Sequence, residues 1–195
     1  MGGSHEGVVV IHLKPRSRLR PSDAPRLAGL LREAGVKPVI VRVAPGRVEV
    51  EVPSHKASDA MREASRLIGD PIEVSGPHGD PSSWLEEFRR LAANQRFWEA
   101  HTAAEAGWRI AGEKWAKALA AAAGALAKAQ EGLIRAALKA SETAAREAEA
   151  HGVGLDPECL RREVERAYTG LEARLEQCIR LDHHKRGEPG GESAG

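Results

Sequence analysis

The stretch NQRFWEAHTAAEAGWR, residues 94–109, places three of the seven aromatic residues of the chain beside one histidine and two glutamates. At about 100° per residue, His101, Glu105 and Trp108 share one face of a helix, whereas Glu99 points away from them. His101 and Glu105 are therefore an i, i+4 pair set in an aromatic stripe, and one side chain can reach the other. Such a pair can fix helix register as hydrogen-bonded partners, line a small-ligand pocket or supply two ligands to a metal ion.

The metal interpretation lacks a ligand, because catalytic zinc generally needs three protein ligands and no third one stands at a recognisable spacing. Gln130 is expected on a facing helix, where its amide could bond to the pair. The candidate polar cluster or ligand pocket therefore contains Glu99, His101, Glu105, Trp108 and Gln130. No cofactor is identified. A divalent metal at His101 and Glu105, with Glu99 or Glu131 as base, is the alternative and would make the protein a metal-assisted hydrolase.

A second candidate is the basic segment KPRSRLRP, which carries Lys14, Arg16, Arg18 and Arg20 after an apolar run. Alternating cations in a loop can contact phosphate groups, or they can simply be solvated. Without interleaved aromatic residues the solvated loop is favoured, and nucleic acid is not an expected partner.

The elements that must position these residues fall into two groups. Residues 1–75 alternate β-branched runs with amphipathic helical patterns in the order β-α-β-β-α-β, which predicts a ferredoxin-like α/β sandwich domain. Folding the hairpin about residues 44–47 places Arg42 opposite Glu49. Its exposed face is expected to carry Ile40, Arg42, Glu49 and Glu51.

Strand patterns end at residues 76–83, a linker rich in Gly, Pro and Ser. Residues 84–184 predict an all-α helical bundle, followed by a disordered polar tail at 185–195. One helix is expected to run to about residue 111, and an alanine-rich helix from 113 to 150 should bend or break near Gly124 or Gly132. Asp156 as N-cap and Pro157 open the last helix, which is expected to continue to about Ile179. The predicted fold class is therefore α+β, with two domains.

Composition limits the partners. The chain has 29 basic and 28 acidic residues and a net charge of +1, so no overall field attracts it to nucleic acid or to an anionic membrane. No segment approaches the ~20 apolar residues of a spanning helix, and no signal peptide is evident. Cys159 and Cys178 are placed on one helix, beyond disulfide reach, which favours a reducing cytoplasm. Arginine outnumbers lysine 21 to 8, a bias found in thermophile proteins and also produced by a GC-rich genome.

The sequence FWEAHTAAEAGW resembles the signature of the domain of unknown function 309 family, and QEGLIRAAL resembles its second motif. The resemblance covers Trp84 to about Ala145. It implies a compact helical bundle and an archaeal thermophile member with an added N-terminal domain, but it supplies no activity. The residues that match the family pattern by position are Glu99, His101, Glu105, Trp108, Gly132, Leu133 and Ile134.

These observations predict a two-domain cytoplasmic protein. The favoured function is a non-catalytic binding or interaction protein with a polar cluster around His101, and its partner would be a protein or a small molecule. Residue patterns do not decide whether the chain is an enzyme or whether it forms a homo-oligomer.

Overall fold

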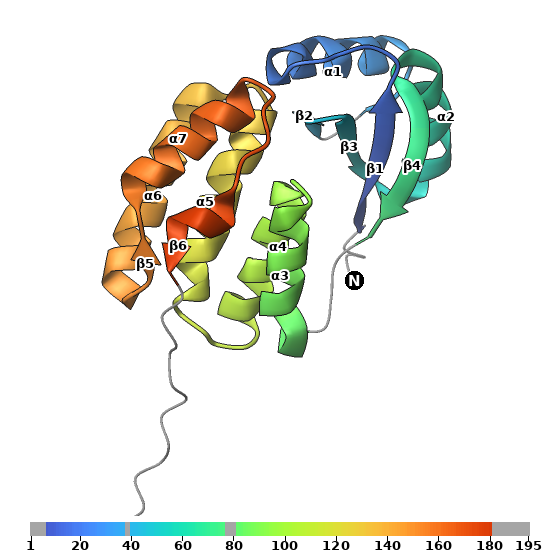
Figure 1. The fold of residues 1–195 in the computed structure, drawn as a ribbon. Helices are drawn as coiled ribbons and strands as arrows, with labels where there is room; N and C mark the ends of the chain where they lie inside the picture. Colours follow the sequence, from blue (N-terminus) through green and yellow to red (C-terminus); the bar gives the residue numbers. More distant parts are fainter. Residues whose placement is uncertain (1–6, 38–39, 77–80, 181–195) are drawn as a thin grey trace, which may run out of the picture.

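The computed structural model describes residues 7–37, 40–76 and 81–180. It confirms an α+β fold in which an N-terminal antiparallel sheet with two helices precedes a region of packed helices. Figure 1 draws the sheet with α1 and α2 at the upper right, α5 to α7 at the left, and α3 and α4 between them. The predicted tail at 185–195 and half of the predicted linker, residues 77–80, lie outside the described residues.

The N-terminal unit is built from four strands and two α-helices. In chain order these are β1 (Val8–Pro15), α1 (Ala24–Glu33), β2 (Ile40–Ala44), β3 (Arg47–Pro53), α2 (Ala57–Leu67) and β4 (Gly69–Ser75). The strands are ordered β2-β3-β1-β4, and every neighbouring pair is antiparallel. The β2–β3 hairpin has the predicted register, with Arg42 opposite Glu49.

The two faces of this sheet differ in chemistry because side chains alternate along each strand. One face is apolar and packs on α1 and α2, with Ile11, Val50 and Leu31 fully buried. The opposite face carries His12, Arg42, Glu49 and Glu51.

The helical region contains five α-helices and two short strands among the described residues. They are α3 (Trp84–Ala93), α4 (Phe97–Arg109), α5 (Ala116–Gln130), α6 (Ile134–His151), β5 (Gly154–Leu155), α7 (Pro157–Tyr168) and β6 (Ile179–Arg180). The single helix predicted up to about residue 111 is wrong, because the chain breaks between α3 and α4, where Gln95 has a φ of 61°. The alanine-rich segment breaks near Gly132, which is one of the two predicted positions. At the other one, Gly124, α5 continues without a break.

Gly132 explains where the second break falls. Its φ is 79°, a left-handed conformation that favours glycine. A Cβ atom there would lie 2.6 Å from the carbonyl oxygen of Pro21, so this turn also sits directly against the N-terminal unit.

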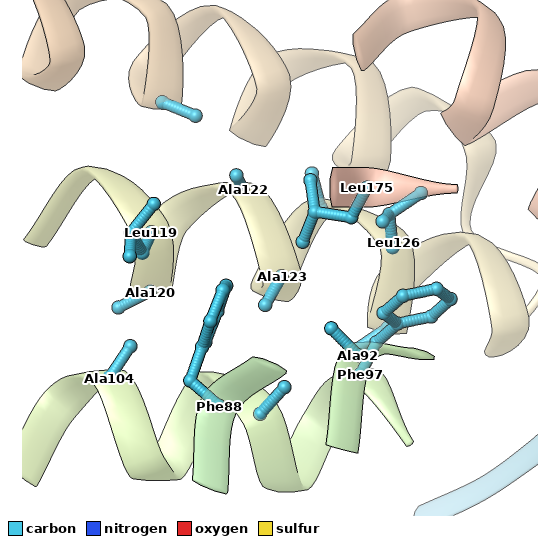
Figure 2. Packing of buried hydrophobic residues seen from close by; sticks show 14 of the residues in the cluster. Phe88, Ala92, Phe97, Ala104, Leu119, Ala120, Ala122, Ala123, Leu126 and Leu175 are labelled. Carbon is cyan, nitrogen blue, oxygen red and sulfur yellow. The ribbon is translucent and has the colours of Figure 1, made fainter. Parts of the chain in front are cut away.

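The core of the helical region is built around α5, whose many alanines let neighbouring helices approach closely. Figure 2 shows Phe88 and Phe97 directed from α3 and α4 toward Leu119 and Leu126 of α5. All four side chains are buried. Large aromatic groups on α3 and α4 therefore fill the space that the alanines of α5 leave.

The last predicted helix is wrong beyond Tyr168. Asp156 caps α7 as predicted, since its side chain accepts a hydrogen bond from the backbone N–H of Cys159. The chain then turns back instead of continuing as a helix, and β6 pairs with β5. This return brings Cys178 beside Cys159 in a disulfide with a Cα–Cα distance of 5.3 Å.

The disulfide overturns the premise from which a reducing compartment was predicted, namely that the two cysteines lie far apart on one helix. The cytoplasmic assignment stays a prediction. Among the described residues, no helix combines the length and apolar character needed to cross a bilayer.

Candidate functional site

The polar face of the sheet is buried, contrary to the prediction from the sequence. The sequence predicted that Arg42, Glu49 and Glu51 would face solvent, and this is wrong: they are 0%, 0% and 4% exposed. His12 on β1 is also fully buried. Residues of α4 and of the turn between α5 and α6 cover these groups, so charged side chains are packed between the two units of the fold.

The first of two clusters on this face centres on His12. The Ser75 hydroxyl donates to Glu99 Oε1 at 2.6 Å, and His12 Nε2 lies 2.8 Å from the same hydroxyl oxygen. Because a hydroxyl has one hydrogen, Ser75 must accept from His12, and Nε2 therefore carries a hydrogen. A chain of hydrogen bonds thus runs from β1 through β4 to α4.

Arg96 holds the same carboxylate from the start of α4. Its Nε donates to Glu99 Oε2 at 2.6 Å, its Nη2 also bonds to Glu99 Oε1, and its Nη1 lies 2.6 Å from Glu73 Oε1. The hydrogen bonds that Arg96 donates to Glu99 raise the pKa of Arg96 above its ordinary value. The guanidinium therefore stays charged and fixes α4 against β4.

Glu49 completes this cluster on the other side of His12. Its Oε1 accepts from Arg47 Nε at 3.1 Å and lies 3.8 Å from His12 Nδ1. Neither His12 Nδ1 nor Glu49 Oε2 has a hydrogen-bond partner in the part of the chain that the structure describes. Three carboxylates (Glu49, Glu73, Glu99) face two guanidinium groups (Arg47, Arg96), so a neutral His12 leaves one net negative charge.

Two kinds of chemistry could use such a cluster. His12, Glu49 and Glu99 present ligand atoms within 4.8 Å of one another, a donor set that suits a divalent metal. The order Ser75, His12, Glu49 is also that of a nucleophile, a base and an orienting acid. However, arginines already hold both metal-ligand carboxylates, and the Ser75 hydrogen points to Glu99 instead of being held by the base. His12 and Glu49 are also sealed from solvent.

The second cluster joins β2 and β3 to the α5–α6 turn. Arg42 donates from Nη2 to Glu51 Oε2 at 2.8 Å and from Nε to Glu131 Oε1 at 3.1 Å. Its guanidinium carbon lies 4.6 Å from the ring centroid of Trp98, a cation–π distance. Arg42 therefore binds residues from three segments that are distant in sequence.

The predicted pair on α4 is found, and its bonds differ from those expected. His101 Nε2 lies 3.9 Å from Glu105 Oε1, and Arg109 donates to that oxygen at 3.0 Å. His101 stacks on Trp98 with centroids 5.1 Å apart, and its Nδ1 lies 2.8 Å from the carbonyl oxygen of Ala120. Gly124 leaves room for this ring, because a Cβ atom there would lie 3.2 Å from Nδ1.

The other members of the predicted cluster lie elsewhere. Glu99 belongs to the His12 cluster. Gln130 is fully buried and donates to the carbonyl oxygen of Gln95 at 3.0 Å, so it is not the partner of His101. Trp108 is flanked by the cations of Arg109 and Lys117. The structure thus brings together His101 and Glu105 and does not add a third ligand from the predicted set.

The basic segment lines a cavity of about 430 Å³ that also touches the β2–β3 turn and Gly170, which follows α7. Lys14, Arg16 and Arg18 contribute to its wall, and no carboxylate from residues 7–37, 40–76 or 81–180 does. Arg20, the fourth predicted cation, lines an adjoining cavity together with Arg18. All four predicted anion-contact residues therefore line one or both of two neighbouring surface cavities.

Sequence reasoning missed His12, Ser75 and Arg96. A signal was present, because the face of β1 that carries Val10 and His12 is the same face that carries Glu49 on β3. A histidine within a β-branched run, aligned with charges on its neighbours, indicates a polar face that another part of the chain covers.

No protein family, curated protein or solved structure matches this chain.

Proposed function

We propose that this protein is a non-catalytic binding protein that holds a small anionic ligand in the cavity lined by Lys14, Arg16 and Arg18. The buried charge clusters fix its two units against each other. We further infer that the N-terminal unit is a ferredoxin-like domain, and that the helical region is a bundle of the type found in the domain of unknown function 309 family.

The sheet order supports the ferredoxin-like inference. A β-α-β-β-α-β chain with both helices on one face and antiparallel order β2-β3-β1-β4 fits the split βαβ arrangement. The resemblance of the helical region rests on the sequence motifs of α4 and of the α5–α6 turn.

The cavity around the basic segment carries the functional proposal. Of the described residues, three cations and no carboxylate line it, and its volume lies within the ~300–1,000 Å³ of ligand sites. Lys14 and Arg18 are exposed and have no ion-pair partner among the described residues. Cations that no acidic group neutralises leave a positive potential for an anion.

The side chain of Arg16 is already ordered by hydrogen bonds to the backbone of α2. Its Nη1 and Nη2 donate to the carbonyl oxygens of Arg66 and Ser65, at 3.0 and 2.9 Å, in the last turns of α2. A guanidinium has five N–H donors, so three remain. Because the side chain is already ordered, binding an anion costs less conformational entropy.

The two histidine sites offer less support for catalysis. His12 is buried and bonded to its neighbours, and His101 shares Glu105 with Arg109. A metal-assisted hydrolase that uses His101 and Glu105 stays the alternative, and it is tested separately below.

Calorimetric titration with inorganic phosphate at low ionic strength tests the proposal. Wild type should bind, and affinity should fall as salt screens the cations. Replacing Lys14 and Arg18 together by glutamine should weaken binding at least ~10-fold, since a hydrogen bond to a charged group contributes about 1.5–3 kcal/mol.

The matched control is Arg89→Gln with Lys139→Gln, which removes the same charges from exposed positions outside both cavities. This control should bind phosphate as wild type does. Equal loss in both double variants, or no binding by wild type, would overturn the proposed function.

A further inference from the structure

A second cavity of about 410 Å³ adjoins the first one and shares Arg18 with it. Its wall is formed by the end of α7 and by the segment before α1, and within the described part of the chain it again contains no carboxylate. Arg18 therefore stands between two hollows. The first cavity is lined by Lys14, Arg16 and Arg18. The second is lined by Arg18, Arg20 and several uncharged residues.

The uncharged residues that line the second cavity include one with an aromatic ring and one with an aliphatic side chain. Tyr168 is the last residue of α7 and is half-buried against the helical core. Leu171 is 47% exposed, and among the described leucines only Leu133 is similarly exposed, at 46%. The chain turns between these residues, so both side chains reach the same cavity. A planar ring is the ligand group that best covers such an aromatic and aliphatic surface.

The second cavity also provides a hydroxyl group for polar recognition. The hydroxyl of Ser22 has no hydrogen-bond partner among the described residues, and Ser22 is exposed at the cavity. Thr169, by contrast, donates its hydroxyl hydrogen to the carbonyl oxygen of Arg166. Ser22 can therefore donate to, or accept from, a hydroxylated linker such as a sugar.

We propose that the two cavities form one site for a sugar phosphate that carries a planar ring, that is, a mononucleotide. This inference rests on the proposed anion-binding function and adds the chemical class of the ligand. The phosphate binds Lys14, Arg16 and Arg18 in the first cavity. The ring stacks on Tyr168 and covers Leu171 in the second cavity, and the sugar passes Arg18 and Ser22.

Binding of four compounds to the full-length protein tests this assignment: inorganic phosphate, ribose 5-phosphate, adenosine and adenosine 5′-monophosphate. The monophosphate should bind roughly 5- to 150-fold more tightly than ribose 5-phosphate, because stacking of a base on an aromatic ring contributes about 1–3 kcal/mol. Adenosine alone should bind weakly, because it lacks the anion.

Three variants separate the ring contribution from protein stability. Tyr168→Leu keeps an apolar group against the core but removes stacking, so it should lose most of the affinity advantage that the monophosphate has over ribose 5-phosphate. It should leave phosphate affinity unchanged. Tyr168→Phe should retain the advantage. Leu171→Ser should reduce it without affecting phosphate.

Equal affinities for ribose 5-phosphate and the monophosphate would overturn the proposal that the ligand carries a planar ring. That result would still support the proposed anion site. Absence of phosphate and monophosphate binding would overturn both proposals. A 5′-phosphorylated oligonucleotide that binds more tightly than the monophosphate would identify a nucleic-acid end as the ligand and would overturn the small-molecule assignment.

Discussion

Arg42 provides the sharpest test of the buried interface. Its side chain is fully buried, and the side chains of its partners Glu51 and Glu131 are only 6% and 11% exposed. Replacing Arg42 by methionine keeps most of the volume but leaves two carboxylates without a counter-charge. Removing one member of a buried ion pair costs about 3–5 kcal/mol. For a chain of this size each kcal/mol lowers Tm by about 2–4 °C, so a fall of roughly 6–20 °C is expected.

The matched control is Arg62→Met. Arg62 also lies near two carboxylates, Asp59 at 2.9 Å and Glu63 at 3.8 Å, but Arg62 and Asp59 are each 70% exposed. Exposed pairs contribute about 0–1 kcal/mol, so this variant should lose at most ~4 °C.

Scanning calorimetry of wild type and both variants measures the difference. A third variant combines Arg42→Met with Glu51→Gln and Glu131→Gln, which removes the stranded charges and should recover much of the lost stability. If Arg42→Met costs no more than Arg62→Met, or if the triple variant is less stable than Arg42→Met alone, the account of this interface as a charge-compensated contact is wrong.

The remaining predictions concern other parts of the fold. Reduction of the Cys159–Cys178 bond, which closes a loop of 19 positions, should cost about 3 kcal/mol and lower Tm by roughly 6–12 °C, and a double alanine variant should not respond to reductant. Glu105→Gln should destabilise less than Glu105→Ala, and chelator should leave the wild-type midpoint unchanged; a chelator effect absent from His101→Ala would support the metal alternative. Added Zn²⁺ should not stabilise the protein through His12, and stabilisation lost in His12→Gln would show a metal site there. Limited proteolysis should cut between Gly76 and Gly79, and protection of that segment would contradict the predicted linker.

Local patterns predicted much of the fold because local physics decides those features. The alternation of valines in β2 and β3 set the hairpin register that pairs Arg42 with Glu49. Asp156 followed by proline marked the start of α7. In each case the signal and the structure it specifies lie within a few residues of each other.

The candidate site was less accessible to sequence reasoning, because its members meet only after the two units pack. A charged strand face looks solvent-exposed when its covering element is unknown, and so Arg42 and Glu49 were misplaced. His12 looked like part of an apolar strand. The end of α7 was missed for another reason: the pattern that continues from Leu171 to Cys178 suits a helix, but the packing of a returning chain and its disulfide prevails there.

The ionic character of the contact between the two units affects how the protein responds to heat. Hydration of charged groups becomes less favourable as temperature rises, so the cost of removing Arg42, Glu51 and Arg96 from water falls on warming. Hydrophobic stabilisation per unit of buried area, by contrast, plateaus at high temperature. The joint between sheet and helices should therefore hold better, relative to the two cores, at high temperature than at low temperature. If the two units separated, the surfaces exposed by that separation would be charged and readily hydrated, unlike the apolar surface that unfolding of either core exposes.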